Sequence, residues 1–162
     1  MNRLFKKQKG LLIDTNLLLL CLIGRISEEL IGKKRTEKYC VEDFKALIAE
    51  LSKFSQICST PYVLTEVYNL GNNALSDKNK EQFLVLISKL VQQVKEKYIP
   101  AKQLTITPIF SKFGLTDASI YQVCQQDNLV ILTDDFPLAN YAEKSKLAVI
   151  NFNHIRQKIR KL

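Results

Sequence analysis

The feature of this sequence that most constrains its fold is the alternation of short apolar runs with longer amphipathic segments. Runs typical of buried β-strands lie at residues 10–13, 56–59, 129–132 and 148–152, and each is followed by residues with helical spacing. Strands that alternate with helices favour a parallel sheet with helices on both faces. We therefore expect an α/β fold whose binding site lies beyond the carboxyl ends of the strands.

The apolar spacing and the capping residues also place the helices. We expect them at residues 17–26, 41–54, 61–70, 77–98, 116–126, 137–144 and 153–162. Thr60 and Pro61 are a helix start, while Gly71 and Pro100 are expected to end helices. Residues 27–40 are expected to be a charged insert, and residues 99–113 an irregular connection with a short strand around 104–106.

The length of 162 residues suits a single domain with its own core. Its net charge is +8, and the excess of Lys and Arg lies in a basic tail at 1–9, in the 27–40 insert and in the basic helix at 153–162. A basic periphery favours a polyanionic partner, and we expect nucleic acid. The residues that we expect to bind it are Lys33, Lys34, Arg35, Arg156 and Arg160.

Cysteine and histidine usage argues against a zinc site. The four cysteines form no Cys-x-x-Cys pair, and His154 is the only histidine. Reduced thiols in a cytoplasmic protein are the expected state. The apolar stretch at 11–23 is interrupted by Asp14, and too few uninterrupted residues remain to span a bilayer, so we expect no membrane segment.

Two acidic positions follow predicted strands directly. Asp14 comes after Leu-Leu-Ile, and the pair Asp134 and Asp135 comes after Leu-Val-Ile-Leu-Thr. A carboxylate between apolar runs must lie at the surface or be paired. Asp14 could cap the following helix, and one of the two later aspartates could cap the helix that begins near Pro137.

Two further carboxylates lie on predicted helices. Asp117 shares a helical face with apolar residues three, four and seven positions later, so it points inward from the first turn. Helix capping is the alternative role, but Thr116 already offers a cap. Glu66 lies at the border of an apolar face, where a solvated glutamate is the simpler interpretation.

Several carboxylates that meet at one edge of a sheet would repel one another. A divalent cation such as Mg²⁺ or Mn²⁺ is the natural counter-charge, because both prefer carboxylate and water ligands. Two such ions can stabilise the attacking and leaving oxygens of a phosphodiester displacement. The acidic residues and the basic periphery together indicate a metal-dependent enzyme that acts on nucleic acid.

Four short blocks carry a resemblance to a known family. They are Leu-Ile-Asp-Thr-Asn at 12–16, Leu-Thr-Glu-Val at 64–67, Gly-Leu-Thr-Asp-Ala at 114–118 and Ile-Leu-Thr-Asp-Asp at 131–135. In order, they resemble the signature blocks of PIN-domain nucleases, over about residues 10–152. The resemblance implies a three-layer α/β/α sandwich with a central parallel sheet, and an RNA substrate.

The resemblance also implies roles for individual residues. Asp14, Glu66 and Asp117 would bind Mg²⁺ or Mn²⁺ or orient water on it. The fourth acid is Asp135 if the family's Thr-x-Asp pattern decides, or Asp134 if adjacency to the strand decides; both stay candidates. Asn16 and Thr133 would hold the ligands in place. Many bacterial relatives are VapC-type toxins with an antitoxin partner, and many are homodimers.

A phosphatase and a nucleotide-binding protein with a phosphate loop are rival functions that the sequence disfavours. A haloacid dehalogenase phosphatase also begins with an aspartate after a strand, but it needs a second aspartate where Asn16 stands. No glycine is placed for a Walker-A or Gly-x-Gly phosphate loop. The alternative that remains is a non-catalytic RNA- or protein-binding module on the same fold.

Overall fold

The computed structural model describes residues 10–161 and contains a five-stranded, wholly parallel sheet. The strand order is β3-β2-β1-β4-β5, with β1 at Gly10–Ile13 in the centre. The other strands are β2 (Gln56–Ser59), β3 (Lys95–Glu96), β4 (Val130–Thr133) and β5 (Val149–Asn151). The α/β expectation is confirmed, and four of the five strands lie where the sequence predicts them.

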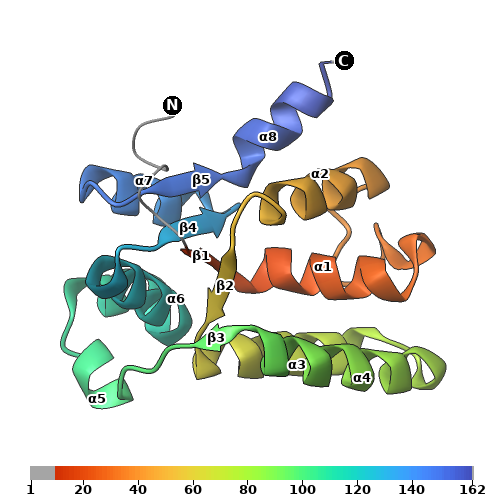
Figure 1. Ribbon diagram of the computed structural model, residues 1–162, viewed down its shortest axis with the longest axis horizontal. Coiled ribbons are helices and arrows are strands. Elements are labelled where there is room, and N and C mark those ends of the chain that lie inside the picture. The colour runs from red at the N-terminus through yellow and green to blue at the C-terminus, as the bar shows by residue number, and fades with distance from the viewer. Residues whose placement is uncertain (1–9, 162) are drawn as a thin grey trace.

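Helices cover both faces of this sheet. In chain order they are α1 (Thr15–Ile26), the short 3-10 helix η2 (Glu28–Leu30), α2 (Val41–Leu51), α3 (Pro61–Ala74), α4 (Asp77–Gln93), α5 (Ala101–Leu104), α6 (Pro108–Asp127), α7 (Phe136–Lys144) and α8 (Phe152–Ile159). In Figure 1, α5 and α6 lie to the left of the strands, while α1, α3 and α4 extend to the right. The result is a three-layer α/β/α sandwich.

The register of the sheet brings two strand ends together. Ile13 of β1 pairs with Leu132 of β4, and the Asp14 amide donates to the Leu132 carbonyl at 3.0 Å. Both strands are buried along their whole length, because helices cover both faces. The residues that follow them, Asp14 and Asp134, are therefore neighbours at the carboxyl edge.

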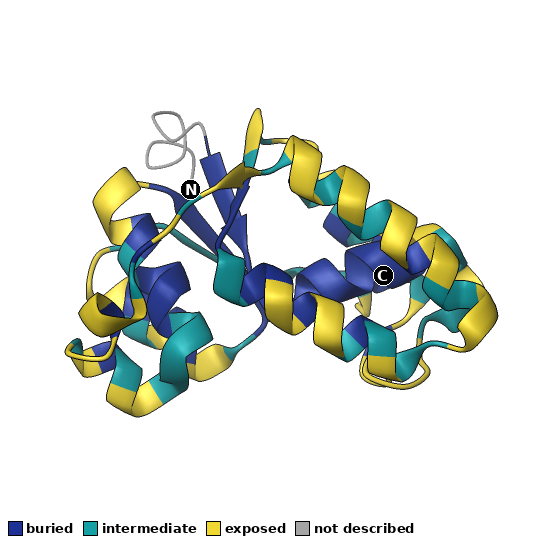
Figure 2. Cartoon of the chain, turned by 90° about the horizontal axis from the view of Figure 1, so that it is seen from below, coloured by how far each residue is buried: buried dark blue, intermediate teal, exposed yellow. Residues whose placement is uncertain are grey.

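The helix predicted at 77–98 is too long. Helix α4 ends at Gln93, and Lys95–Glu96 forms β3, which pairs with the end of β2. The prediction fails because only Phe83 of this helix is buried, and Tyr98 is 66% exposed. Figure 2 shows the exposed outer faces of the surface helices against the buried strands.

Gly71 does not end α3, which continues to Ala74. A side chain at position 71 would meet the Phe83 ring, because an added Cβ would lie 2.1 Å from Phe83 Cζ. The glycine therefore lets α4 approach α3 closely. Its small size serves helix packing, which the sequence pattern alone does not distinguish from a helix end.

The connection predicted at 99–113 is helical. Residues 101–104 form α5 in place of the expected strand, and α6 begins at Pro108, well before the predicted start at 116. Within α6, Gly114 has φ 84° and ψ −174°, a conformation that favours glycine. This break starts a new helical turn just before Asp117.

The 27–40 insert is anchored at two side chains. Thr36 is completely buried, and its hydroxyl donates to the Lys33 carbonyl at 2.7 Å. Tyr39 is 4% exposed and faces the carboxyl edge of the sheet. The predicted basic tail at 1–9 lies outside the described residues.

All four cysteines, Cys21, Cys40, Cys58 and Cys124, are free, and all but Cys40 are buried. Within residues 10–161, none of the helices has the length and apolar character that crossing a bilayer requires.

Candidate functional site

Asp14 is held rigidly between β1, β4 and α1. Its Oδ1 accepts a hydrogen bond from the Leu17 amide at 3.0 Å, so Asp14 caps α1. Its Oδ2 accepts from the Asp134 amide at 3.1 Å and from the Thr133 hydroxyl. Asp14 thus takes the capping role considered for it, and its role in a metal site stays a prediction.

The environment of Asp14 disfavours its charge. Burial raises the pKa of this carboxyl above its usual range, and the nearby Asp134 carboxylate raises it further. The hydrogen bonds from Thr133, Leu17 and the Asp134 amide act in the opposite direction. A cation beside this pair would favour the ionised form.

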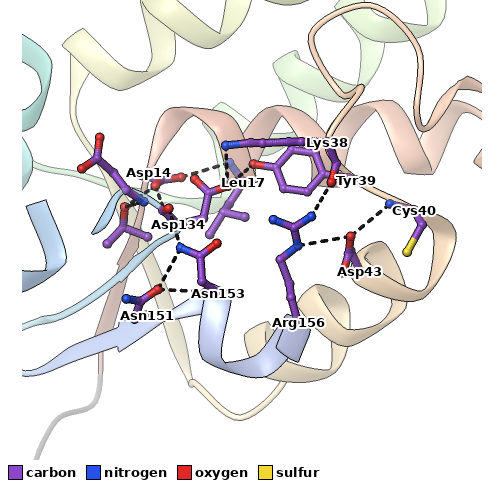
Figure 3. Close-up of polar contacts among 12 residues, drawn as sticks. Asp14, Leu17, Lys38, Tyr39, Cys40, Asp43, Asp134, Asn151, Asn153 and Arg156 are labelled. Atoms are coloured by element: carbon purple, nitrogen blue, oxygen red, sulfur yellow. Dashed lines mark hydrogen bonds and ion pairs between the residues drawn. The ribbon is translucent and has the colours of Figure 1, made fainter. Parts of the chain in front are cut away.

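Asp134 binds the charged insert. Its Oδ2 accepts a hydrogen bond from the Tyr39 hydroxyl at 2.5 Å and lies 2.7 Å from Lys38 Nζ (Figure 3). Its Oδ1 is buried and has no hydrogen-bond partner among the described residues. Burial, and then the charge of Asp134, keep the pKa of Tyr39 well above its usual range, so its hydroxyl stays a donor.

Arg156 of α8 holds the 27–40 insert in place. Its guanidinium lies 5.2 Å from the Tyr39 ring centroid and donates to the Lys38 carbonyl. Its Nε lies 3.3 Å from Oδ2 of Asp43, which also accepts from the Cys40 amide at 3.0 Å. Since Asp43 is 1% exposed, Arg156 is the buried cation that balances it.

We expect the Arg156→Met variant to lose about 2 kcal/mol of unfolding free energy, because the buried Asp43 carboxylate would lose its nearer ion-pair partner. Arg160→Met is the matched control: its side chain is 61% exposed and 4.0 Å from the same Asp43 oxygen. Urea unfolding of both variants measures the difference. Equal stabilities would contradict the structural role of Arg156.

A second group of carboxylates lies around Asp117 in the new turn after Gly114. Burial raises the pKa of Asp117 to about 7, and the charges of Asp135 and Glu66 contribute to the rise. Asp135 caps α7, because its Oδ1 accepts from the Leu138 amide at 2.8 Å. Glu66 is exposed on α3. None of these three carboxylates forms an ion pair with the described part of the chain.

The raised pKa of Asp117 should appear as a pH dependence of stability. The folded state keeps a proton to about pH 7, whereas the unfolded carboxyl releases it near 3.8, so unfolding free energy should fall as pH rises between these values. Thermal unfolding in EDTA should show a decline from pH 5 to pH 8 that is smaller in Asp117→Asn. An identical slope in the variant would contradict this placement of Asp117.

The chemistry of these donors suits a divalent ion. All are carboxylate oxygens, the ligands that Mg²⁺ and Mn²⁺ prefer. No three Asp, Glu, His or Cys side chains within residues 10–161 converge closely enough to hold a metal alone. Mg²⁺ commonly uses one or two carboxylates and completes its shell with water and substrate phosphate, which this arrangement accommodates.

The structure places the other predicted site residues as follows. Thr133 donates a hydrogen bond to Asp14, and its role in holding a metal ligand stays a prediction. Asn16 is exposed in the first turn of α1. The side chains of the insert, Lys33, Lys34 and Arg35, are exposed, as is Arg160. Arg156 is instead 12% exposed and occupied by Asp43. Their binding of nucleic acid stays a prediction.

Sequence reasoning missed Lys38 and Tyr39. The sequence gives one signal for Tyr39: an aromatic residue inside a charged segment needs somewhere to bury its ring. Asn153 was also missed; its Nδ2 donates to the Asp134 carbonyl at 2.6 Å. Lys38 resembles the other lysines of the insert in sequence, and only the fold distinguishes it.

Comparisons with known proteins support the fold. No known family model and no curated protein matches the sequence. The structure of FitAcB from Neisseria gonorrhoeae is similar with a TM-score of 0.53 and 19% identity, over 89% of this chain and 99% of that one. A domain of a functionally unknown protein from Methanocaldococcus jannaschii DSM 2661 gives a TM-score of 0.47 and 18% identity, over 88% and 89%. The likeness to FitAcB agrees with the three-layer α/β/α sandwich described above.

Proposed function

We propose that this protein is a metal-dependent endoribonuclease. The observation that carries the proposal is the group of carboxylates at the carboxyl edge of the sheet, in which Asp117 is raised to a pKa of about 7 beside Asp135 and Glu66. The mutual repulsion of these carboxylates opposes folding when all of them are ionised. Such an arrangement is typical of a site that binds a cation.

We propose that Asp117 and Asp135 bind the metal ion directly, and that Glu66 and Asp14 lie at the margin of the metal site. Asp135 is preferred over Asp134 because Asp134 Oδ2 already binds Lys38 and Tyr39. A bound Mg²⁺ or Mn²⁺ would supply an activated water and charge stabilisation for phosphodiester hydrolysis. The protein's own part is positional: Asp14 and Thr133 tie β1 to β4, and the cap on α7 orients Asp135.

The test is cleavage of a labelled single-stranded RNA. We expect hydrolysis with Mg²⁺ or Mn²⁺ and none with EDTA, and restoration when the metal is returned in excess. Cleavage that persists in EDTA would contradict a metal-dependent site. Asp117→Asn, which we expect to lose cleavage, is purified in parallel and controls for a contaminating nuclease.

A second candidate is a non-catalytic RNA- or protein-binding module. The observation that favours it is that no three potential ligands of the described chain converge. Such a module would bind RNA equally well with or without EDTA and would not cleave it.

An antitoxin partner, a homodimer and a cytoplasmic location likewise stay predictions. Exposed apolar side chains on α4, such as Leu84 and Val85, offer a surface for a protein partner.

A further inference from the structure

Lys38 places a cation at the carboxyl edge of the sheet, and its contacts with the fold fix the position of that cation. Lys38 Nζ lies 2.7 Å from Asp134 Oδ2 and 5.1 Å from the Tyr39 ring centroid. Yet the Lys38 side chain is 49% exposed, whereas that of Asp134 is 2% exposed. The carboxylate therefore lies beneath the ammonium, and the solvent side of the ammonium is open.

The backbone of Lys38 is fixed as well. Arg156 donates to its carbonyl oxygen, and Tyr39, the next residue, is buried and bound to Asp134 (Figure 3). An exposed lysine usually loses side-chain entropy when it binds a phosphate. Here the ion pair with Asp134 has already restricted the side chain, so less entropy remains to be lost.

The ammonium also has unused hydrogen-bonding capacity. It carries three donors, and Asp134 is its one acceptor among the described residues. The acidic residues beside it would repel a polyanion, so a strand that enters this edge needs a fixed cation close to them. Arg156 is less available for this contact, because its side chain is 12% exposed and already contacts Asp43 and the Lys38 carbonyl.

We propose that Lys38 is a substrate-positioning residue that binds a backbone phosphate of a single-stranded nucleic acid at the carboxyl edge of the sheet, with Asp134 and Tyr39 as its support. The inference rests on the proposed function for its substrate class. Lys38 would contribute to RNA affinity, whereas the carboxylates would hold the metal ion.

The test measures RNA binding without metal, so that it is independent of cleavage. Fluorescence anisotropy of a labelled single-stranded RNA in EDTA, over a range of KCl concentrations, would compare wild type, Lys38→Met, Lys38→Arg and Lys33→Met. Lys33 belongs to the same insert and is exposed, so its variant removes one positive charge at a position that is not paired with Asp134.

We expect Lys38→Met to weaken binding several-fold and to reduce the log–log salt slope by about 0.7, the value of one lost phosphate contact on a single strand. Lys33→Met should change both much less, and Lys38→Arg should keep most of the slope. Equal effects of Lys38→Met and Lys33→Met would overturn the proposal, since only net charge would then matter.

A purely structural role would give another result. Lys38→Met would lower the melting temperature while leaving RNA affinity unchanged, and that outcome would also overturn the proposal. If Lys38→Met folds poorly, the Lys38→Met/Asp134→Asn variant removes both charges of the ion pair. We expect this double variant to bind RNA more weakly than wild type. Wild-type affinity in the double variant would count against the proposal. Wild-type protein that cleaves RNA while Lys38→Met binds normally would leave the nuclease function standing and remove only this inference.

Discussion

Asp117→Asn should reduce RNA cleavage at least about a hundredfold while leaving the fold intact. Residues that only support metal ligands typically cost 10–100-fold when they are changed, and Asp117 is proposed as a ligand itself. The amide is nearly the same size and carries no charge, so it relieves the repulsion from Asp135 and Glu66. Initial rates of cleavage at saturating Mg²⁺, together with thermal unfolding, measure both parts of this expectation.

Asp127→Asn is the matched control for this variant. Asp127 is the last residue of the same helix, and it pairs with Lys97 at 2.5 Å beside Gly10, where β1 begins. It therefore lies at the opposite edge of the sheet from Asp14. We expect its variant to cleave RNA like wild type; equal rates for the Asp117 and Asp127 variants would exclude a specific role for Asp117.

Phe83→Ala should cause a large loss of stability, about 4 kcal/mol of unfolding free energy, or a fall in Tm of roughly 10 °C. Phe83 is fully buried and is the one buried residue of α4, so its ring joins that helix to α3 across Gly71. Its removal leaves a cavity and takes away the main apolar anchor of α4. Chemical denaturation measures the change.

Val85→Ala provides the comparison on the same helix. Val85 is 54% exposed, so its variant should change stability by less than about 0.5 kcal/mol. If Phe83→Ala were no more destabilising than Val85→Ala, the claim that Phe83 anchors α4 to α3 would be contradicted. Because Phe83 is not among the residues proposed to bind metal or RNA, residual folded protein should keep its RNA affinity.

The sequence predicts the buried part of this fold well. Strands such as β1 and β4 are covered on both faces, so they appear as continuous apolar runs, and the aspartates that follow them mark the carboxyl edge. The short strand β3 gives no such signal, because Lys95 and Glu96 are exposed. Its place in the sheet comes from pairing with β2, a long-range contact that local spacing does not encode.

The sequence identifies only part of the candidate site, for a similar reason. A carboxylate after an apolar run is visible in the sequence, as Asp14 shows, and its contact with Thr133 follows from the pairing of two predicted strands. The contact between Lys38 and Asp134 joins an irregular insert to a strand end. No periodicity fixes where such an insert lies, so only the structure distinguishes Lys38 from Lys33 and Lys34.

The most direct test of the central claim is a crystal structure of the protein soaked in Mn²⁺, with anomalous diffraction recorded at a wavelength where manganese scatters strongly. The account predicts an anomalous peak beside the carboxylates of Asp117 and Asp135, and its absence from crystals of Asp117→Asn. A fully soaked wild-type crystal with no peak at this edge, or with a peak only elsewhere, would contradict a metal-binding role for these carboxylates.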